Sequence, residues 1–231
     1  MTGSRRVAVK LYIIRHGQTD WNVAGRIQGR QDIPLNAQGR LQARALAEGM
    51  SERPVTAVYS SPQIRALETA KAIAEPLKLT VELLPQLMEI SYGTWEGRTV
   101  QDILATDGER YDAWRRHPAG VAPPGGETLA QIDERCGLAW EYIRSRIRGD
   151  IAMVSHGSTL AHFMAYLLKG QPDSRDMIVG NASITTIEYF PEERICRLVE
   201  LNDRRHLERG QAAPKSPIER KRSGPSDRAY L

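Results

Sequence analysis

Three short segments of the chain place histidine or arginine side chains directly after runs that are typical of buried strands. They are Arg15-His16-Gly17, the turn from Ser60 to Arg65, and Ser155-His156-Gly157. Guanidinium groups can bind phosphoryl oxygens bidentately, and a helix that starts near Pro62 adds positive potential. The residue types at these points therefore indicate a site for a phosphoryl group.

A neutral imidazole can supply the nucleophile at such a site. Its reference pKa is about 6.5, and nearby arginine charges favour the neutral form, whose lone pair can attack phosphorus without a separate base. An alkoxide leaving group needs a proton, so one Asp or Glu must donate a proton and afterwards activate water. The chemistry thus requires a carboxyl group from another part of the chain.

Apolar, β-branched runs predict the strands that position these segments. Residues 7–14, 55–59 and 151–154 form short runs that end at polar turns. Two further strands are expected over 183–189 and 195–201. The carboxyl ends of the first three strands therefore carry the candidate residues.

Helical periodicity lies between the strands, over 64–77, 129–147 and 160–168. Ser61 is the expected N-cap of the first helix, with Pro62 at its first position. Thr128 and Gln131 have capping-box spacing ahead of the second helix. Gly170 is the expected C-cap of the third.

This alternation predicts an α/β fold. We expect a three-layer αβα sandwich whose central sheet is mostly parallel and covered by helices on both faces. In such sheets ligands bind beyond the carboxyl ends of the strands. The three segments should therefore meet at one edge of the sheet.

The composition is that of a globular protein, because 41% of the 231 residues are apolar and 26% are charged. No apolar run reaches the length of about 20 residues that a membrane span needs, and the N-terminus lacks a signal-peptide pattern. We therefore expect a cytoplasmic protein without a membrane partner. Cys136 and Cys196 are expected to be buried thiols rather than metal ligands.

The net charge of +4 is concentrated near the C-terminus. Asp203 to Leu231 carry eight Lys and Arg against four Asp and Glu, so the preceding part of the chain is formally neutral. This distribution argues against a nucleic-acid partner. We predict a flexible N-terminus over 1–6, one domain over 7–203, and a basic, disordered tail over 204–231.

Other conspicuous side chains are assigned to packing or to the surface. His162 is not on the same helical face as His156, so it is expected to be a packed or surface residue rather than a metal partner. His206 is expected to be solvated. Trp95 is expected to pack in the core, whereas Trp114 is equally compatible with packing and with a place at the mouth of the site.

The ordered set of motifs resembles the histidine phosphatase (phosphoglycerate mutase-like) superfamily. The similarity covers about residues 9 to 202. Its motifs are Arg15 to Asn22, Gly25 to Gly29, Pro34-Leu35-Asn36 with Gly39, Tyr59 to Pro62 with Arg65, Glu89 with Gly93 to Gly97, Gly125-Gly126-Glu127, and Ser155-His156-Gly157. Each lone motif is weak evidence, but their common order is not expected by chance.

The resemblance implies catalytic roles for five residues. His16 corresponds to the phosphorylated nucleophile, and Arg15, Arg65 and His156 correspond to the pocket around the phosphoryl oxygens. Glu89 corresponds to the proton donor and acceptor.

The resemblance also implies three residues around the substrate and no metal or cofactor. Asn22 corresponds to a ligand of a phosphate oxygen, and Gln28 and Gly29 line the substrate mouth. The strand ends carry no cluster of acidic or Cys/His ligands, which agrees with chemistry that needs no metal.

Within the resemblance, the expected activity is hydrolysis of a small phosphorylated metabolite. Mutases of this superfamily carry a long insertion after the catalytic Glu, whereas only 37 residues separate Glu89 from Glu127. A 2,3-bisphosphoglycerate-dependent mutase stays the enzymatic alternative, and a non-catalytic binding module is a third hypothesis. A homodimer could pair through the sheet edge formed by residues 183–201.

Overall fold

The computed structural model describes residues 8–169 and 177–209, with a six-stranded sheet in the order β3-β2-β4-β1-β5-β6. The strands are β1 (Val9–Arg15), β2 (Val55–Ser60), β3 (Val81–Leu83), β4 (Asp150–Ser155), β5 (Ile184–Phe190) and β6 (Ile195–Asp203). The strands β1 to β4 run parallel to one another, β5 runs antiparallel to β1, and β6 runs antiparallel to β5. The expected mostly parallel sheet is confirmed.

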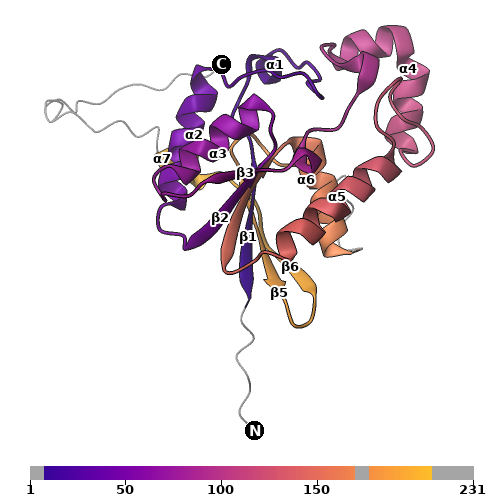
Figure 1. The fold of residues 1–231 in the computed structure, drawn as a ribbon. Helices are drawn as coiled ribbons and strands as arrows, with labels where there is room; N and C mark the ends of the chain where they lie inside the picture. Colours follow the sequence, from indigo (N-terminus) through magenta and orange to yellow (C-terminus); the bar gives the residue numbers. More distant parts are fainter. Residues whose placement is uncertain (1–7, 170–176, 210–231) are drawn as a thin grey trace, which may run out of the picture.

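Helices cover both faces of this sheet (Figure 1). The helices α2 (Ala37–Met50), α3 (Ile64–Ala74) and α7 (Arg205–Arg209) lie on one side, and α5 (Leu129–Arg144) and α6 (Gly157–Leu168) lie on the other. The short helix α1 (Asp20–Val23), α4 (Val100–Arg116) and the 3-10 turns η1 (Pro85–Leu87) and η2 (Gly93–Trp95) belong to the connections. The architecture is the predicted three-layer sandwich.

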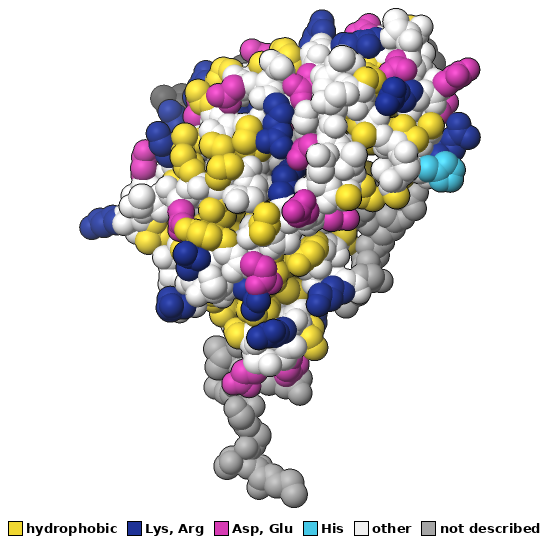
Figure 2. All heavy atoms as spheres, turned by 45° about the vertical axis from the view of Figure 1, so that its right-hand side comes forward, with side chains coloured by type: hydrophobic (Ala, Val, Ile, Leu, Met, Phe, Trp, Pro, Cys, Tyr) yellow, Lys and Arg dark blue, Asp and Glu magenta, His cyan; other side chains and the backbone are white. Residues whose placement is uncertain are grey.

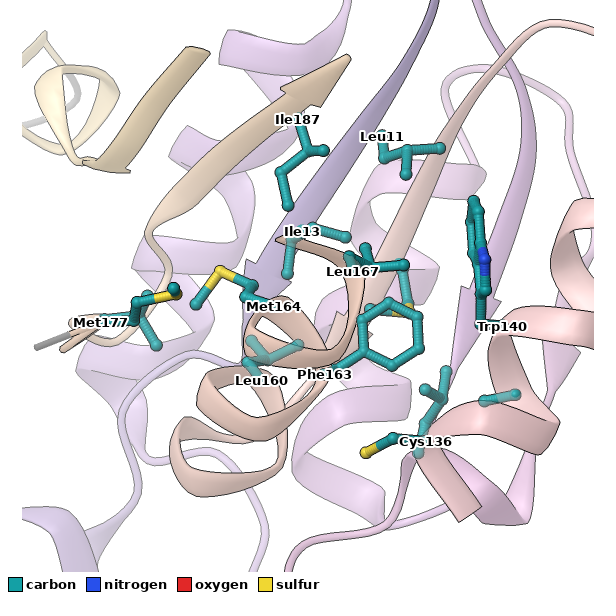
Figure 3. Packing of buried hydrophobic residues seen from close by; sticks show 14 of the residues in the cluster. Leu11, Ile13, Cys136, Trp140, Leu160, Phe163, Met164, Leu167, Met177 and Ile187 are labelled. Carbon is teal, nitrogen blue, oxygen red and sulfur yellow. The ribbon is translucent and has the colours of Figure 1, made fainter. Parts of the chain in front are cut away.

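The period of two along β1 divides its apolar side chains between two cores. Leu11 and Ile13 face the core beneath α5 and α6, where Phe163 of α6 is almost fully buried (Figure 3). Tyr12 and Ile14 face the opposite core beneath α2 and α3. The strand is therefore buried on both faces, which explains its continuous apolar run.

The N-terminus of α3 differs from the prediction. The helix begins at Ile64 with Gln63 as N-cap, and Gln63 makes no capping hydrogen bond with its side chain. Instead, the carboxylate of Asp32 accepts a hydrogen bond from the backbone N–H of Ile64 at 2.6 Å. Ser61 lies three positions before the helix, where its hydroxyl oxygen accepts from Gln63 N at 3.2 Å and from His156 Nε2 at 2.8 Å.

The helix α6 starts earlier than its apolar periodicity suggested. It begins at Gly157 and ends before Lys169, which has a left-handed φ of 38°. The expected C-cap, Gly170, lies outside the described residues. The early start matters for the site because it places the first free backbone N–H groups of the helix directly after His156.

The described chain continues past the boundary predicted at residue 203. Arg205–Arg209 form α7, which contacts α2. The prediction that His206 is solvated is wrong, because only 8% of it is exposed and its Nε2 donates to the carbonyl oxygen of Ala182 at 2.8 Å. The predicted flexible N-terminus and the rest of the predicted tail lie outside the described residues.

The segment from 94 to 125, which contains α4, forms an excursion from the sandwich, and its two ends lie next to each other. At its base, Thr94 N donates to Pro124 O at 3.0 Å, and Glu127 N donates to Ser91 O at 2.9 Å. A Cβ atom on Gly93 would lie 2.0 Å from Pro124 O, so only glycine permits this approach. The two ends of the excursion are therefore tied together.

Within the excursion, Trp95 anchors α4 to the domain. Its side chain is fully buried, and its Nε1 donates to the carboxylate of Asp107 at 2.8 Å. Asp107 lies at a kink of α4, where its φ and ψ are −145° and 31°. The bond therefore fixes the bend that brings the second half of α4 back over the domain.

Both cysteines are free and buried, as expected for packing residues. Burial raises the pKa of Cys136 to about 12 and that of Cys196 to about 11, so both stay protonated thiols at neutral pH. Among the helices of residues 8–169 and 177–209, none combines the length and apolar character needed to cross a membrane.

The packing of α6 on the sheet predicts a large stability loss for Phe163→Ala. Removing this buried ring should lower the free energy of unfolding by about 3–5 kcal/mol, because the cavity left behind cannot fully collapse. Urea denaturation followed by circular dichroism measures the change. Leu138→Ala on the exposed side of α5, where the side chain is 56% exposed, should stay within about 0.5 kcal/mol of the wild type. Equal losses in both variants would contradict the described core.

Candidate active site

The carboxyl ends of β1, β4 and β2 bring the three chemical segments together. Arg15 pairs with Ser155 in the parallel register of β1 and β4, so the residues that follow them, His16 and His156, are neighbours. Their ring centroids are 5.1 Å apart. The backbone N–H of His16 donates to Ser155 O at 3.0 Å, which fixes the loop after β1 against the end of β4.

Arg65 lies beneath the two histidines and is fully buried. Its Nε donates to Nδ1 of His156 at 3.1 Å, its Nη1 to Gln31 O at 2.7 Å, and its Nη2 to Gly29 O at 2.9 Å. Burial lowers the pKa of Arg65 to about 10, so the group remains cationic at neutral pH. A guanidinium group has five N–H donors. Two of them are therefore left for an anion.

Arg15 contributes a second cation from the end of β1. Its Nη1 donates to Val179 O at 2.7 Å, while its Nε is buried and has no partner among the described residues. An unsatisfied buried donor costs about 1–3 kcal/mol. Gly157, at the start of α6, lies directly beside this guanidinium group, because a Cβ atom at this position would be 3.4 Å from its central carbon. The free donor indicates a place for an anionic ligand.

The hydrogen bond of His16 assigns its tautomer. Nδ1 lies 2.6 Å from the carbonyl oxygen of Gly17, which can only accept, so Nδ1 carries the proton and Nε2 carries the lone pair. Burial, together with the charges of Arg15 and Arg65, holds the pKa of His16 well below its ordinary value of 6.5. The ring is therefore neutral, with a nucleophilic Nε2.

His156 has the opposite tautomer. Its Nδ1 accepts from Arg65, so its Nε2 carries the proton and donates to the hydroxyl oxygen of Ser61 at 2.8 Å. Burial and the charge of Arg65 hold the pKa of His156 well below 6.5. The ring thus orients the Arg65 guanidinium group without adding a second proton acceptor to the site.

Glu89 reaches the site from the segment after η1, and it occupies the N-terminus of α6. Its Oε1 accepts from Ile90 N at 2.9 Å, from Thr159 N at 2.9 Å and from the Thr159 hydroxyl group at 3.0 Å. Its Oε2 has one long contact, 3.3 Å from Ser158 N. Because Oε1 is fully engaged, Oε2 is the oxygen that can exchange a proton with a ligand.

A partly buried ion pair lies on the far side of Glu89 from the histidines and supports its position. Arg135 of α5 contacts Glu127 at 2.8 Å and donates to the carbonyl oxygen of Met88 at 2.8 Å and to the Thr159 hydroxyl group at 3.3 Å. Burial alone would raise the pKa of Glu127, but hydrogen bonding from Ser91 and the charge of Arg135 lower it below the ordinary value. Arg135 therefore positions Met88, which precedes Glu89, and Thr159, which donates a hydrogen bond to Glu89.

The structure places the three predicted substrate-binding residues around the loop that follows β1. The Oδ1 atom of Asn22 accepts from Thr19 N at 3.0 Å and from Asn181 Nδ2 at 3.2 Å, so this oxygen caps α1. Gln28 is buried, and its Oε1 has no partner among the described residues. Gly29 has a left-handed φ of 51° and holds Arg65 through its carbonyl oxygen.

A cavity of about 680 Å³ opens beside Arg15, Glu89 and Ser158. Asn22, Gln28 and Gly29 are not among its lining residues, whereas Trp114 and His162 are. His162 lies 3.9 Å from the carboxylate of Asp133, and burial lowers its pKa. Arg65 and the two histidines are not among the lining residues either, so the cavity extends from Arg15 and Glu89 toward α4, α5 and α6.

Sequence reasoning missed several supporting residues. Ser61 was interpreted as a helix cap, and no role was predicted for Thr159 or Arg135. Ser61 and Thr159 each lie within or beside a recognised motif, which is a signal for them, whereas Arg135 stands alone in a helix. No group of three or more His, Cys, Asp or Glu side chains within residues 8–169 and 177–209 is arranged to hold a metal ion.

The arrangement is suited to substitution at an anionic centre. A neutral imidazole with a free lone pair lies beside the fully buried Arg65 and the partly buried Arg15, and a carboxyl oxygen lies at the start of the adjacent helix. Fixed cations of this kind stabilise charge that develops in a transition state without further reorganisation.

Comparison with known proteins agrees with this chemistry. The family model of the histidine phosphatase superfamily (branch 1) matches residues 11–204. Phosphoserine phosphatase 1 of Hydrogenobacter thermophilus is 33% identical over 201 residues, which cover 86% of this chain and 94% of that protein. Phosphoglycerate mutase-like protein 4 of Arabidopsis thaliana is 33% identical over 190 residues, or 80% and 81% of the two chains.

Solved structures share the fold as well. The mycobacterial glucosyl-3-phosphoglycerate phosphatase in complex with VO3 superposes with a TM-score of 0.76 at 34% identity, covering 85% of this chain and all of the other. A putative α-ribazole-5′-P phosphatase from Escherichia coli gives a TM-score of 0.78 at 28% identity, covering 86% of this chain and 98% of the other.

The buried, neutral histidines predict that the protein loses stability in mild acid. In the unfolded chain both rings titrate near their ordinary pKa of about 6.5. Below that pH the unfolded state binds protons that the native state does not, so the free energy of unfolding falls as the pH falls. The slope can reach about 1.4 kcal/mol per pH unit for each histidine.

Urea titrations at several pH values measure this slope. His16→Asn keeps a neutral polar side chain but removes one titrating group, so the pH dependence should become shallower. A slope that is the same in the wild type and in His16→Asn would contradict a buried neutral ring at position 16.

Proposed function

Because the chain belongs to the histidine phosphatase superfamily (branch 1), we propose that it hydrolyses its phosphate ester through a phosphohistidine on His16. The chain is a phosphoric monoester hydrolase that acts on small phosphorylated metabolites. The observation that carries the mechanism is the tautomer of His16: the bond from Nδ1 to Gly17 leaves the Nε2 lone pair free beside two cations.

In the first half-reaction, Nε2 of His16 attacks phosphorus, a P–N bond forms and the P–O bond to the leaving group breaks. Arg15 and Arg65 bind the phosphoryl oxygens with their remaining donors, and His156 orients Arg65. Glu89 gives a proton from Oε2 to the departing alkoxide. The unprotonated state of the imidazole makes a separate base unnecessary.

In the second half-reaction, Glu89 takes a proton from water. The hydroxide forms a new bond to phosphorus as the P–N bond breaks, and inorganic phosphate leaves. The same carboxyl oxygen thus serves as acid and then as base, which restores both residues to their starting states.

The remaining parts of the proposal are the class of substrate, a cytoplasmic location and the pairing of two copies of the chain. The relatives include enzymes named for phosphoserine, glucosyl-3-phosphoglycerate and α-ribazole-5′-P, which are all small phosphorylated metabolites. A cytoplasmic location is supported by two free, buried thiols. Pairing of two copies through β6 is supported by the 53% exposure of Ile195 and Val199 on this edge strand.

Replacing the nucleophile is the decisive test. His16→Ala should lower phosphate release from a panel of phosphate monoesters by on the order of 10³-fold or more, because no other group supplies the lone pair. Rapid quenching in alkali should recover a phosphorus–nitrogen adduct from the wild type only. His117→Ala, which changes an exposed histidine, is the matched control.

Three results would contradict the proposal. Undiminished hydrolysis by His16→Ala would exclude the phosphohistidine route. Conversion of 3-phosphoglycerate to 2-phosphoglycerate by the wild type, without hydrolysis of any ester, would favour the mutase. No turnover of any kind would favour the binding module.

The role of Glu89 predicts a dependence on the leaving group. In Glu89→Gln, kcat/KM for an alkyl phosphate should fall by about 10²–10⁴-fold, because the alkoxide departs without a proton. An aryl phosphate with an acidic phenol should lose much less, because its leaving group needs no protonation. Glu134→Gln, on the exposed face of α5, should leave both rates unchanged. Equal losses for both esters in Glu89→Gln would show that Glu89 is not the proton donor.

A further inference from the structure

The face of the molecule in Figure 2 mixes basic, acidic and hydrophobic side chains rather than presenting one continuous basic patch. Binding of a large polyanion would need an extended basic surface. The most informative contacts outside the reactive groups lie in the interior instead. They belong to the segment over 179–183, which directly precedes β5 and lies against the loop that carries the nucleophile.

Backbone groups of this segment hold the two catalytic residues where β1 ends. The carbonyl oxygen of Val179 accepts from Nη1 of Arg15 at 2.7 Å. The backbone N–H of Ala182 donates to His16 O at 3.1 Å, and Ala182 is fully buried. The segment therefore fixes the loop after β1 from the side of β5.

Asn181 adds a side-chain donor to these backbone bonds. Its Nδ2 lies 3.1 Å from His16 O, 3.4 Å from Gly17 O and 3.2 Å from Oδ1 of Asn22. Each of these three oxygens accepts hydrogen bonds and donates none, so Nδ2 rather than Oδ1 of Asn181 faces them. One N–H bond thus serves Asn22, and the other serves the two carbonyl oxygens.

The peptide groups on both sides of Gly17 are held at their nitrogen atoms by two helices. Gly17 N donates to the hydroxyl group of Thr69 in α3 at 3.1 Å. Gln18 N donates to Oε1 of Gln42 in α2 at 2.8 Å. A Cβ atom on Gly17 would lie 2.6 Å from Gly39 O, so the position requires glycine. Because a glycine backbone rotates more freely than that of other residues, its carbonyl oxygen needs a partner as well.

The orientation of the Gly17 carbonyl group decides which nitrogen of His16 keeps the proton. The oxygen lies 2.6 Å from Nδ1 of the ring, and this contact leaves the lone pair on Nε2. If the peptide group turned away, the ring would lose the acceptor that selects this tautomer. The N–H bond of Asn181 at the same oxygen opposes that rotation.

The same amide group fixes the orientation of Asn22. Oδ1 of Asn22 accepts from Thr19 N at 3.0 Å, from the Thr19 hydroxyl group at 3.1 Å and from Asn181. A flipped Asn22 amide would bring its N–H bonds against these donors. Nδ2 of Asn22 is therefore the end of the side chain that is available to a phosphoryl oxygen.

We propose that Asn181 is a positioning residue for the nucleophile. Its amide group holds the Gly17 carbonyl oxygen against Nδ1 of His16, which keeps the lone pair on Nε2, and it turns the amide nitrogen of Asn22 toward the phosphoryl group. The inference rests on the proposed function, because it concerns the residue that forms the P–N bond. Asn181 acts through these neighbours and not through contact with the reacting atoms.

The tautomer can be measured by NMR in protein that contains ¹⁵N-labelled histidine, because protonated and unprotonated ring nitrogens differ in chemical shift. The His16→Asn variant assigns the signals of His16. The wild type should carry the proton on Nδ1 alone, whereas Asn181→Ala should show a second population with the proton on Nε2. Asn181→Asp keeps the size of the side chain but turns an oxygen toward three acceptors, so its second population should be larger.

The kinetic effect should lie in bond formation to His16 and not in protonation of the leaving group. In Asn181→Ala, kcat/KM should fall by about 10- to 100-fold for an alkyl phosphate, and by the same factor for an aryl phosphate with an acidic phenol. Glu89→Gln should instead spare the aryl ester. A single-turnover experiment with rapid quenching should show slower formation of the phosphorus–nitrogen adduct in Asn181→Ala.

Asn202→Gly is the matched control for loosening of the segment. Oδ1 of Asn202 accepts from Gly180 N at 2.7 Å, so the variant removes a bond to the same segment without touching Gly17 or Asn22. Asn202 has a left-handed φ of 59°, which glycine adopts without strain. The control should keep the wild-type tautomer and stay within about two-fold of the wild-type kcat/KM.

Urea denaturation shows that each variant is folded before it is compared. A single Nδ1-protonated tautomer in both Asn181 variants, or an equal change in Asn202→Gly, would overturn this inference alone. A proton on Nε2 of His16 in the wild type would overturn the inference and the proposed mechanism together. Failure of the wild type to hydrolyse any ester would overturn the proposed function, while the NMR spectra would still test how His16 is positioned.

Discussion

The site depends on a guanidinium group that has no access to solvent. Removal of a charge from water costs several kcal/mol unless partners surround it. Arg65 therefore fixes the positions of its three acceptors, the carbonyl oxygens of Gly29 and Gln31 and the Nδ1 atom of His156. These acceptors come from distant parts of the chain, so one buried cation joins the loop after β1 to the end of β4. Burial, together with this charge, lowers the pKa of both histidine rings and keeps them neutral.

Much of the fold could be predicted from sequence because its central strands are buried on both faces. Their continuous apolar runs predicted β1, β2 and β4, and the motifs at their carboxyl ends predicted the edge of the sheet where the two histidines and Arg65 meet. The helix α4 escaped notice because Ile103 is its only buried residue in the described structure, so it has almost no apolar periodicity. The strand β3 has only three residues and gives no periodic signal at all.

The sequence predicted the residues of the site that could take part in chemistry better than it predicted the residues that position them. His16, Arg65 and His156 lie in motifs that strand ends present, and the structure places them in one cluster. The groups that set their tautomers and hold Glu89 act across long sequence separations, such as Ser61 on His156 and Arg135 on Thr159. Such pairings arise only when the helices pack, and residue spacing does not encode them. The start of α3 was misplaced for the same reason, since its cap comes from Asp32.

Backbone hydrogen bonds hold the two ends of the 94–125 segment together, so this segment forms its part of the cavity wall apart from the strand ends. Thr94 and Glu127 are bonded to partners at one point of the domain. Four of the residues that line the cavity, Trp114, Arg115, Arg116 and Pro118, lie within this excursion, whereas the two histidines and Arg65 lie elsewhere in the chain. Substitutions at these four positions therefore alter one part of the cavity wall from a segment that is separate in sequence from the histidines.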